Sequence, residues 1–440
     1  MSPAAPRVDM RAQIERLYPI CRSITGDGVR ETLEVIGARL PALEVVSVPS
    51  GTTAYDWTVN DEWNVREAYV ADSTGRRVVD LADHTLHLVG YSVPVRATLT
   101  WDELRPHLHT LPDHPDWIPY RTSYYHRDWG FCLTRRRYDE LADGSRPGPY
   151  EVVVDATLGP GVLNYGELLI PGQSAEEVLF TAHVCHPSLA NDNLAGIAVA
   201  VALAQRISAL PQRRWSYRFL FAPGTIGSIT WLAGNPDAPS RVRHGMVLTG
   251  LGGPGPLVYK RTRRGDRRID DVGASVVERR DGQVRAYSPY GYDERQFNAL
   301  GFDMPVGRLS RTPHGEYPEY HTSADDLDLV KDDKLVEALD TVSEVVDVLE
   351  NDRVYRNLAP YGEPQLGKRG LYPSTGGRNA SETVMAMLWI LAYADGQMSL
   401  LEIARRSDVG FGLLKDAAQT LCEAGLLADE GSAEGRFQLR

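Results

Sequence analysis

Residues 178–210, with the sequence VLFTAHVCHPSLANDNLAGIAVAVALAQRISAL, decide the fold of this chain. The segment opens with a largely apolar run from Val178 to His183, which is typical of a strand buried on both faces of a sheet. From Asn191 to Leu210 the apolar side chains recur at the spacing of one broad helix face. A buried strand followed closely by such a helix predicts an α/β sheet, whose strand carboxyl ends bind ligands.

The sequence on either side continues this alternation of strands and helices. Strands are expected at 43–48, 217–222 and 246–251, and helices at 8–20, 29–40 and, with a clear amphipathic pattern, 334–350. The hydrophobic content of 42% and charged content of 24% are close to the average for globular proteins. The chain is therefore expected to fold into compact domains, the largest of them an α/β domain.

Two parts of the chain have a different texture. Between 57 and 151, short β-like runs alternate with Pro, Gly and Asp turns, which predicts an inserted β-rich domain. Residues 359–377 carry five Gly and three Pro, as a linker does. Beyond it, three short helices, the second opened by the capping box Ser399 to Glu402, and a hairpin tail predict a winged helix. The expected domains are 1–56 with 152–356, 57–151, and 365–440.

Composition excludes several classes of partner. The net charge is −12, and the predicted winged helix carries slightly more acidic than basic residues, so we expect no nucleic acid partner. No apolar run approaches the roughly 20 residues of a membrane span, and the N-terminus lacks the apolar core of a signal peptide. The four cysteines form no CxxC pair. We expect a cytoplasmic protein with a small-molecule substrate, and a winged helix that serves docking or homo-oligomer formation.

The most informative polar residues follow the buried strand. His183 ends that strand, and Asp192 is expected at the start of the next helix. An imidazole and a carboxylate that meet at a sheet edge suit a divalent ion such as Zn²⁺. The alternative is purely structural, with Asp192 as a helix N-cap and His183 as a hydrogen-bonded strand end.

Two further segments could close over the same sheet edge. Residues 311–326, RTPHGEYPEYHTSADD, place His321 and several acids before the long helix, although the segment could be only a capped helix entry. In Tyr290-Gly-Tyr-Asp-Glu-Arg295, the acids Asp293 and Glu294 begin a short helix. Paired acids in a first helical turn more often complement the helix dipole than take part in catalysis.

Together these motifs resemble those of the bacterial aminopeptidase-like family. The similar stretches are His183 with Asp192-Asn-Leu-Ala-Gly196, Pro-Gly-Thr-Ile-Gly-Ser at 223–228, Gly-Tyr-Asp-Glu-Arg-Gln at 291–296 and Gly-Glu-Tyr-Pro-Glu-Tyr-His-Thr-Ser-Ala-Asp at 315–325. The resemblance covers nearly the whole chain. It implies the three-layer α/β sandwich of the zinc aminopeptidases, with an inserted β-domain and a C-terminal winged helix.

The resemblance also implies a metal site. Asp192 corresponds to the carboxylate that bridges two metal ions, and His183 and His321 correspond to one histidine ligand of each ion. Two positions depart from the family pattern, because Gly224 stands in place of the usual Glu and Gly253 in place of the usual Asp. Glycine supplies neither a ligand nor a base, so zinc would be held differently, with help from His186 or Cys185, or would be absent.

We therefore predict an enzyme on an aminopeptidase scaffold that acts at the amide or amine of a small aminoacyl-type substrate, redirected from general proteolysis to a step in specialised metabolism. Its remaining candidate residues are Glu294 as the catalytic base and Arg121, Tyr124, Tyr125 and Glu319 as substrate-binding residues. For the tyrosines the alternative is one packed face of a strand. A non-catalytic pseudopeptidase that binds or scaffolds is the second hypothesis, and a winged-helix regulator is disfavoured by charge.

Overall fold

The computed structural model describes residues 9–372 and 378–432, which form two compact units. One unit comprises the chain up to Ile269 together with Val277–Thr341. The other comprises Asp270–Val276 and the chain from Val342 onward. The first unit is built on a mixed eight-stranded sheet of order β1-β10-β12-β11-β13-β16-β14-β15. The pairs β11–β12, β11–β13 and β13–β16 are parallel, so their carboxyl ends share one edge of the sheet.

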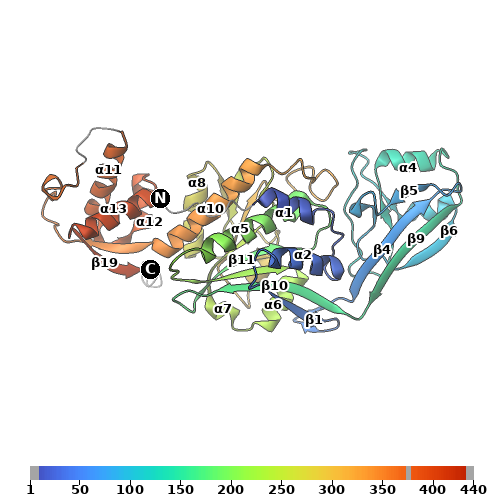
Figure 1. Ribbon diagram of the computed structural model, residues 1–440, viewed down its shortest axis with the longest axis horizontal. Helices are drawn as coiled ribbons and strands as arrows, with labels where there is room; N and C mark the ends of the chain where they lie inside the picture. The colour runs from blue at the N-terminus through green and yellow to red at the C-terminus, as the bar shows by residue number, and fades with distance from the viewer. Residues whose placement is uncertain (1–8, 373–377, 433–440) are drawn as a thin grey trace. The chain divides into compact units, whose positions relative to one another are not determined.

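Helices cover both faces of this sheet, which gives the expected three layers. Figure 1 shows α1 and α5 on one side of β10 and β11, and α6 and α7 on the other. The strands are β1 (Glu44–Pro49), β10 (Val162–Ile170), β11 (Glu177–His183), β12 (Ser216–Ala222), β13 (Val242–Leu248), β14 (Leu257–Lys260), β15 (Gln283–Arg285) and β16 (Val306–Arg311). The helices are α1 (Met10–Leu17), α2 (Asp27–Gly37), α5 (Gly196–Ser208), α6 (Ile226–Gly234), α7 (Ala238–Arg241), α8 (Arg268–Glu278), α9 (Glu294–Phe297) and α10 (Asp332–Asn351).

The predicted start of the helix beside the site is wrong. The helix expected from Asn191 begins only at Gly196, as α5. The preceding turn contains Asp192 with φ −110° and ψ 79° and Asn193 with φ −142° and ψ 32°, which are not helical angles. Asp192 is therefore not a helix N-cap.

The segment between β1 and β10 is β-rich and contains the predicted insertion (Figure 1). Its antiparallel sheet has the order β5-β4-β9-β6, and its core includes Val70, Val79, Phe131 and Val152, all buried. The elements are β2 (Thr53–Ala54), β3 (Trp57–Thr58), β4 (Glu62–Ala71), β5 (Arg77–Asp80), β6 (Val95–Leu99), α3 (Trp101–Leu104), β7 (Leu108–His109), β8 (Phe131–Cys132), α4 (Arg135–Ala142) and β9 (Tyr150–Gly159). Such a sheet buries one apolar face of its own.

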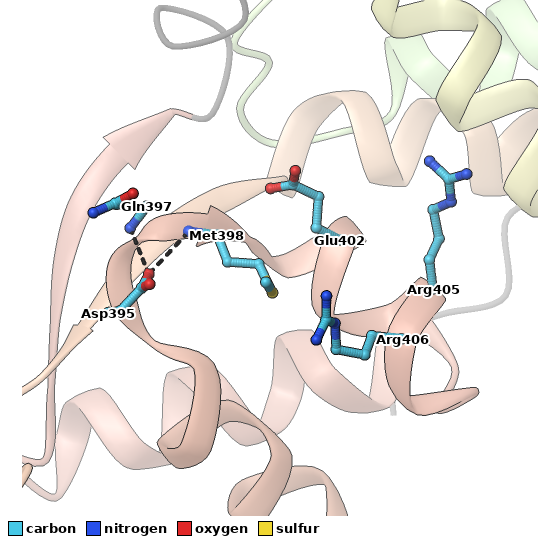
Figure 2. Close-up of a pocket in the computed structure, with 6 residues that line it drawn as sticks. All are labelled: Asp395, Gln397, Met398, Glu402, Arg405 and Arg406. Atoms are coloured by element: carbon cyan, nitrogen blue, oxygen red, sulfur yellow. Dashed lines mark hydrogen bonds between the residues drawn. The ribbon is translucent and has the colours of Figure 1, made fainter. Parts of the chain in front are cut away.

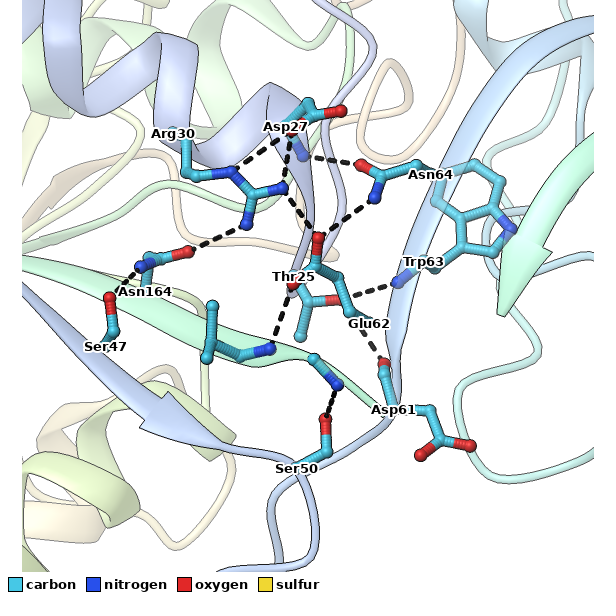
Figure 3. A network of polar contacts seen from close by, with 12 residues as sticks. Thr25, Asp27, Arg30, Ser47, Ser50, Asp61, Glu62, Trp63, Asn64 and Asn164 are labelled. Atoms are coloured by element: carbon cyan, nitrogen blue, oxygen red, sulfur yellow. Dashed lines mark hydrogen bonds and ion pairs between the residues drawn. The ribbon is translucent and has the colours of Figure 1, made fainter. Parts of the chain in front are cut away.

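A polar network fixes the point where the chain enters this insertion (Figure 3). Arg30 of α2 donates to Glu62 Oε1 at 2.6 Å and to Asn164 Oδ1 at 3.2 Å. The other oxygen of Glu62 accepts from the backbone N–H of Val162 at 2.9 Å. Thr25 Oγ1 accepts from the backbone N–H of Trp63 at 3.1 Å. The first strand of the insertion is thereby bonded to both α2 and β10.

Within the described residues, the second unit carries a three-stranded sheet, the helices α11 to α13, and parts of α8 and α10. The sheet has β17 (Arg353–Asn357) between β18 (Asp395–Ser399) and β19 (Leu427–Ser432), and the helices are α11 (Arg378–Tyr393), α12 (Leu400–Ser407) and α13 (Phe411–Glu423). The predicted capping box of Ser399 and Glu402 is confirmed. β17 precedes the predicted linker, so the winged-helix sheet includes residues that the sequence analysis assigned to the α/β domain. β19 pairs with β17, and the rest of the expected hairpin tail, like residues 373–377 of the linker, lies outside the described residues.

No helix within residues 9–372 and 378–432 is both long and apolar enough to cross a bilayer.

Candidate metal and substrate site

The structure brings the three predicted ligands together. His183 Nε2 lies 2.9 Å from Asp192 Oδ1, and His321 Nε2 lies 3.1 Å from Asp192 Oδ2. A third imidazole joins them, because His186 Nδ1 lies 3.7 Å from the same Oδ2. His183 ends β11, Asp192 lies in the turn before α5, and His321 lies in the loop before α10. Three imidazoles therefore surround one carboxylate at the carboxyl edge of the parallel strands.

Long-range hydrogen bonds explain why Asp192 lies in a turn rather than in a helix. Both carboxylate oxygens of the buried Asp325 accept backbone N–H groups, from Asn191 at 2.5 Å and from Asp192 at 3.0 Å. Asn193 Nδ2 donates to the backbone carbonyl of Leu248, at the end of β13, at 3.1 Å. Buried backbone groups require such partners. The turn is thus fixed by residues distant in the sequence, and it presents the Asp192 carboxylate to the histidines.

The electrostatics of this cluster suit a cation. Burial alone would raise the pKa of Asp192, but the nearby His186 and the hydrogen bonds with His183 and His321 hold it well below its usual range. Burial lowers the pKa of His186 to about 3, so its imidazole is neutral. Among the described residues, the buried Nδ1 atoms of His183 and His186 have no hydrogen-bond partner. Neutral imidazoles and an ionised carboxylate are zinc ligands.

The geometry fits one metal ion. Ligand atoms of His183, His186 and Asp192 all lie within 4.8 Å of one another. At the two positions that depart from the expected pattern only the backbone takes part: Gly224 donates its N–H to Cys185 Sγ at 3.2 Å, and Gly253 donates its N–H to Asn191 Oδ1 at 2.9 Å. Catalytic zinc sites commonly have three protein ligands. His183, His186 and Asp192 together supply three ligands, which is enough for one ion.

A pocket of about 340 Å³ opens above the cluster. One wall belongs to the insertion and includes Tyr120, whose ring meets His186 and His321 edge-on at centroid distances of 5.3 and 5.0 Å. Backbone hydrogen bonds join this wall to the ligand loop, from Tyr120 N–H to the His321 carbonyl and from Ser323 N–H to the Ile118 carbonyl, each at 2.9 Å. The insertion therefore forms part of the pocket.

The predicted base, Glu294, lies outside the residues that line this pocket. It is buried, and its Oε1 accepts from Lys260 Nζ at 2.9 Å and from Arg308 Nη1 at 3.4 Å. Its neighbour Asp293 does line the pocket, and its Oδ1 accepts the backbone N–H of Thr225 at 2.7 Å. Burial raises the pKa of Asp293. The geometry thus favours Asp293 over Glu294 for a contact with a ligand.

The four predicted substrate-binding residues divide into two groups. Arg121 and Tyr124 line the pocket; Arg121 Nη1 donates to His109 Nδ1 at 3.2 Å, and the hydroxyl groups of Tyr124 and Tyr120 are 2.8 Å apart. Tyr125 is 58% exposed, packs edge-on against Trp57 and does not line the pocket. Glu319 does not line it either.

Comparison with known proteins agrees with this arrangement. A family model described as a domain of unknown function, DUF4910, matches residues 11–352, and a winged helix-turn-helix model matches residues 353–429. This chain belongs to the DUF4910 family. A curated relative from Clostridium acetobutylicum is 47% identical over 417 residues, covering 94% of each chain, and is named as a candidate polysaccharide biosynthesis protein with an aminopeptidase-like domain.

Solved structures extend the comparison. A candidate peptidase from Clostridium acetobutylicum matches with a TM-score of 0.89 and 46% identity over 96% of each chain. BSAP, a zinc aminopeptidase from Bacillus subtilis, matches with a TM-score of 0.55 and 14% identity over 77% of this chain and 93% of its own. At that identity the likeness shows the fold alone. The expected aminopeptidase-like fold with a C-terminal winged helix is confirmed.

Sequence reasoning missed part of the DUF4910 pocket. Arg295 and His314 line it, but each is a single residue in a loop or short helix with no spacing that marks it. His186 had a signal, because it follows His183 by three residues in the same strand-end motif. The sequence analysis accordingly named it, with Cys185, as a residue that could help to hold zinc, and the structure places it beside Asp192.

The winged helix of this DUF4910 protein has a pocket of its own, of about 500 Å³ (Figure 2). Its polar groups are used locally. The Asp395 carboxylate accepts the N–H groups of Gln397 and Met398, Glu402 caps α12, and Arg405 pairs with Asp271 at 3.1 Å. We assign no ligand to it.

The cation on α13 is paired within the second unit. The helix carries Lys415, whose ammonium lies 2.7 and 2.8 Å from the two carboxylate oxygens of Asp347, and the acids Asp416 and Glu423. A helix that reads DNA normally presents unpaired cations to the phosphates.

Proposed function

We propose that this chain is a metal-dependent hydrolase that acts at the amide or amine of a small aminoacyl-type substrate. The observation that carries the proposal is the convergence of three histidines that line the pocket, His183, His186 and His321, on the Asp192 carboxylate. His183 and Asp192, with His186 or His321, would hold Zn²⁺. Zinc so bound supplies a Lewis acid and lowers the pKa of a coordinated water.

The chain's own residues have separate functions in this proposal. Asp293, a buried carboxylate that lines the pocket, accepts a proton during the reaction, a task that calls for a group within reach of the substrate. Tyr120 and Tyr124 form the wall on the side of the insertion and exclude water from the reacting bond. Arg121 at the same wall binds a polar end of the substrate.

The substrate is expected to be a metabolite rather than a protein. General aminopeptidase chemistry in related folds uses two metal ions, whereas Gly224 and Gly253 leave this site with ligands for one. The curated relative from Clostridium acetobutylicum is named for polysaccharide biosynthesis, which supports a biosynthetic step for this chain as well. The paired Lys415 on α13 supports a docking or dimerisation function of the winged helix over nucleic acid binding.

The test combines metal analysis with turnover. The protein is purified without chelators, its zinc per chain is measured by mass spectrometry, and a panel of amino acid amides and N-aminoacyl sugars is screened for hydrolysis. We expect about one zinc per chain and turnover that His183→Ala abolishes. Arg16→Gln, which alters an exposed ion pair with Glu31, is the control. A metal-free protein that binds members of the panel without hydrolysing them would refute the proposal and favour the pseudopeptidase, which the two glycines also support.

A further inference from the structure

Three cations, Lys260, Arg295 and Arg308, lie close enough beside the pocket to interact with one another. Lys260 and Arg308 both contact one acid, Glu294. Arg295, which follows Glu294 and lines the pocket, forms no ion pair within the part of the chain that the structure describes. Its Nε atom is buried and has no hydrogen-bond partner there. A buried guanidinium N–H without an acceptor is costly, so this group calls for a ligand.

A second donor without an acceptor belongs to a residue that lines the same pocket. His314 Nδ1 lies 3.3 Å from Arg308 Nη1. A guanidinium only donates hydrogen bonds, so Nδ1 must be the acceptor and the ring proton must lie on Nε2. This Nε2 is buried and has no partner among the described residues, and His314 lines the pocket. The ring is held in place by Tyr290 and Tyr292, at centroid distances of 4.8 and 4.5 Å.

The two donors specify the chemistry of what they bind. A neutral carbonyl could accept both hydrogen bonds but would leave the charge of Arg295 uncompensated in a half-enclosed site. A carboxylate supplies two acceptor oxygens and the missing negative charge, and its planar geometry matches the guanidinium fork. The pocket volume of about 340 Å³ is near the lower end of the range for small-molecule sites.

We propose that Arg295 and His314 form a subsite for a carboxylate, so that the substrate is a small aminoacyl compound with a free carboxylate group. Arg295 binds the charge, and His314 Nε2 donates the third hydrogen bond. The identity of the reacting bond rests on the proposed function, whereas the carboxylate subsite rests on the two orphan donors alone.

The experiment measures binding and needs no turnover. N-acetylalanine and N-acetylalaninamide differ only in carboxylate against amide, and both are titrated calorimetrically into the full chain. Because hydrogen bonds to charged groups are worth about 1.5–3 kcal/mol, wild type should bind the carboxylate about 10- to 100-fold more tightly. Arg295→Gln should abolish this preference, Arg295→Lys should keep part of it, and His314→Phe should reduce it several-fold. Arg16→Gln should leave it unchanged.

Equal affinity of wild type for the two probes, or a preference that survives Arg295→Gln, would overturn the subsite. So would a preference lost only in Arg121→Gln, which would place the carboxylate on the insertion. Arg295→Gln breaks no ion pair, so its melting temperature should match wild type; should it fail to fold, Arg295→Lys carries the test. Carboxylate-selective binding without any hydrolysis would contradict the proposed function and leave the subsite standing.

Discussion

By the resemblance drawn from the sequence, Gly224 stands where a glutamate is expected, and Gly224→Glu would supply that carboxylate. The structure leaves room for the new side chain. A Cβ atom built on Gly224 would lie 3.5 Å from Cys185 Sγ and 3.8 Å from His183 Cβ, which are ordinary van der Waals contacts. The backbone of Gly224 is also outside the left-handed region that only glycine adopts readily. We therefore expect the variant to fold with a melting temperature close to that of wild type.

The expected gain follows from what the carboxylate would do. A positioned general base typically contributes about 10²- to 10⁴-fold to a rate. Because Cys185 and His183 lie directly beside the new Cβ, the Glu side chain can reach the cluster around Asp192. We expect turnover of alanine p-nitroanilide to rise by about 10²-fold, and zinc content per chain to rise above that of wild type. Both are measured on protein purified without chelators.

A matched variant supplies the contrast. A Cβ built on Gly253 would lie 3.3 Å from Asn191 Nδ2, so Gly253→Asp must displace a side chain that accepts N–H groups from Gly252 and Gly253. It should lower the melting temperature, and it should raise turnover less. If Gly224→Glu melts like wild type yet gains neither zinc nor activity, the missing carboxylate is not what limits this site, and the reasoning fails.

Four other substitutions test three separate parts of the structure. Asp325→Asn should weaken zinc binding by about 10- to 100-fold in a metal titration, because the turn that presents the ligand Asp loses one backbone acceptor; unchanged affinity would mean that the turn holds itself. Arg121→Ala and Tyr124→Phe should each lower ligand affinity at native-like melting temperature, and unaltered binding in both would leave the insertion as a structural cover. The hydrogen bond from Arg30 lowers the pKa of Glu62 to about 2. The contribution of the ionised Glu62 to folding stability is therefore fully present above its ordinary pKa of 4.5 and is lost as the pH falls through about 2. In urea unfolding, Glu62→Gln should therefore be less stable than wild type by about 1–3 kcal/mol at pH 7. The difference in stability should disappear near pH 2. A difference that persists at pH 2 would count against the ion pair.

His183 could be anticipated from the sequence as a candidate metal ligand because it follows a local rule. His183 ends a strand whose apolar run is unambiguous, and the carboxyl ends of parallel strands share an edge. The turn of Asp192 could not be anticipated. Its helical pattern continues without a break, and the competing hydrogen bonds come from Asp325 and from the end of β13, more than 50 positions away.

Choosing between neighbouring acids was also beyond the sequence. Asp293 and Glu294 are adjacent, and the one that faces the pocket is decided by Lys260 and Arg308, which draw Glu294 into the protein. The same applies to Arg295 and His314. That their donor atoms lack an acceptor can be recognised only when the hydrogen bonds of the surrounding residues are known. β17 was misassigned because a strand of five residues carries no sign of which sheet it will join.

The backbone bonds between the insertion and the ligand loop restrict how this pocket can change during evolution. The segment from Ile118 to Tyr120 runs antiparallel to the segment from His321 to Ser323, in register at Pro119 and Thr322. A residue inserted or deleted between 118 and 120 would shift that register and carry His321 away from Asp192. Exchanging the side chain of Arg121 leaves the register intact. Lineages that alter the substrate should therefore differ here by substitutions, while gaps in an alignment should fall elsewhere in the insertion.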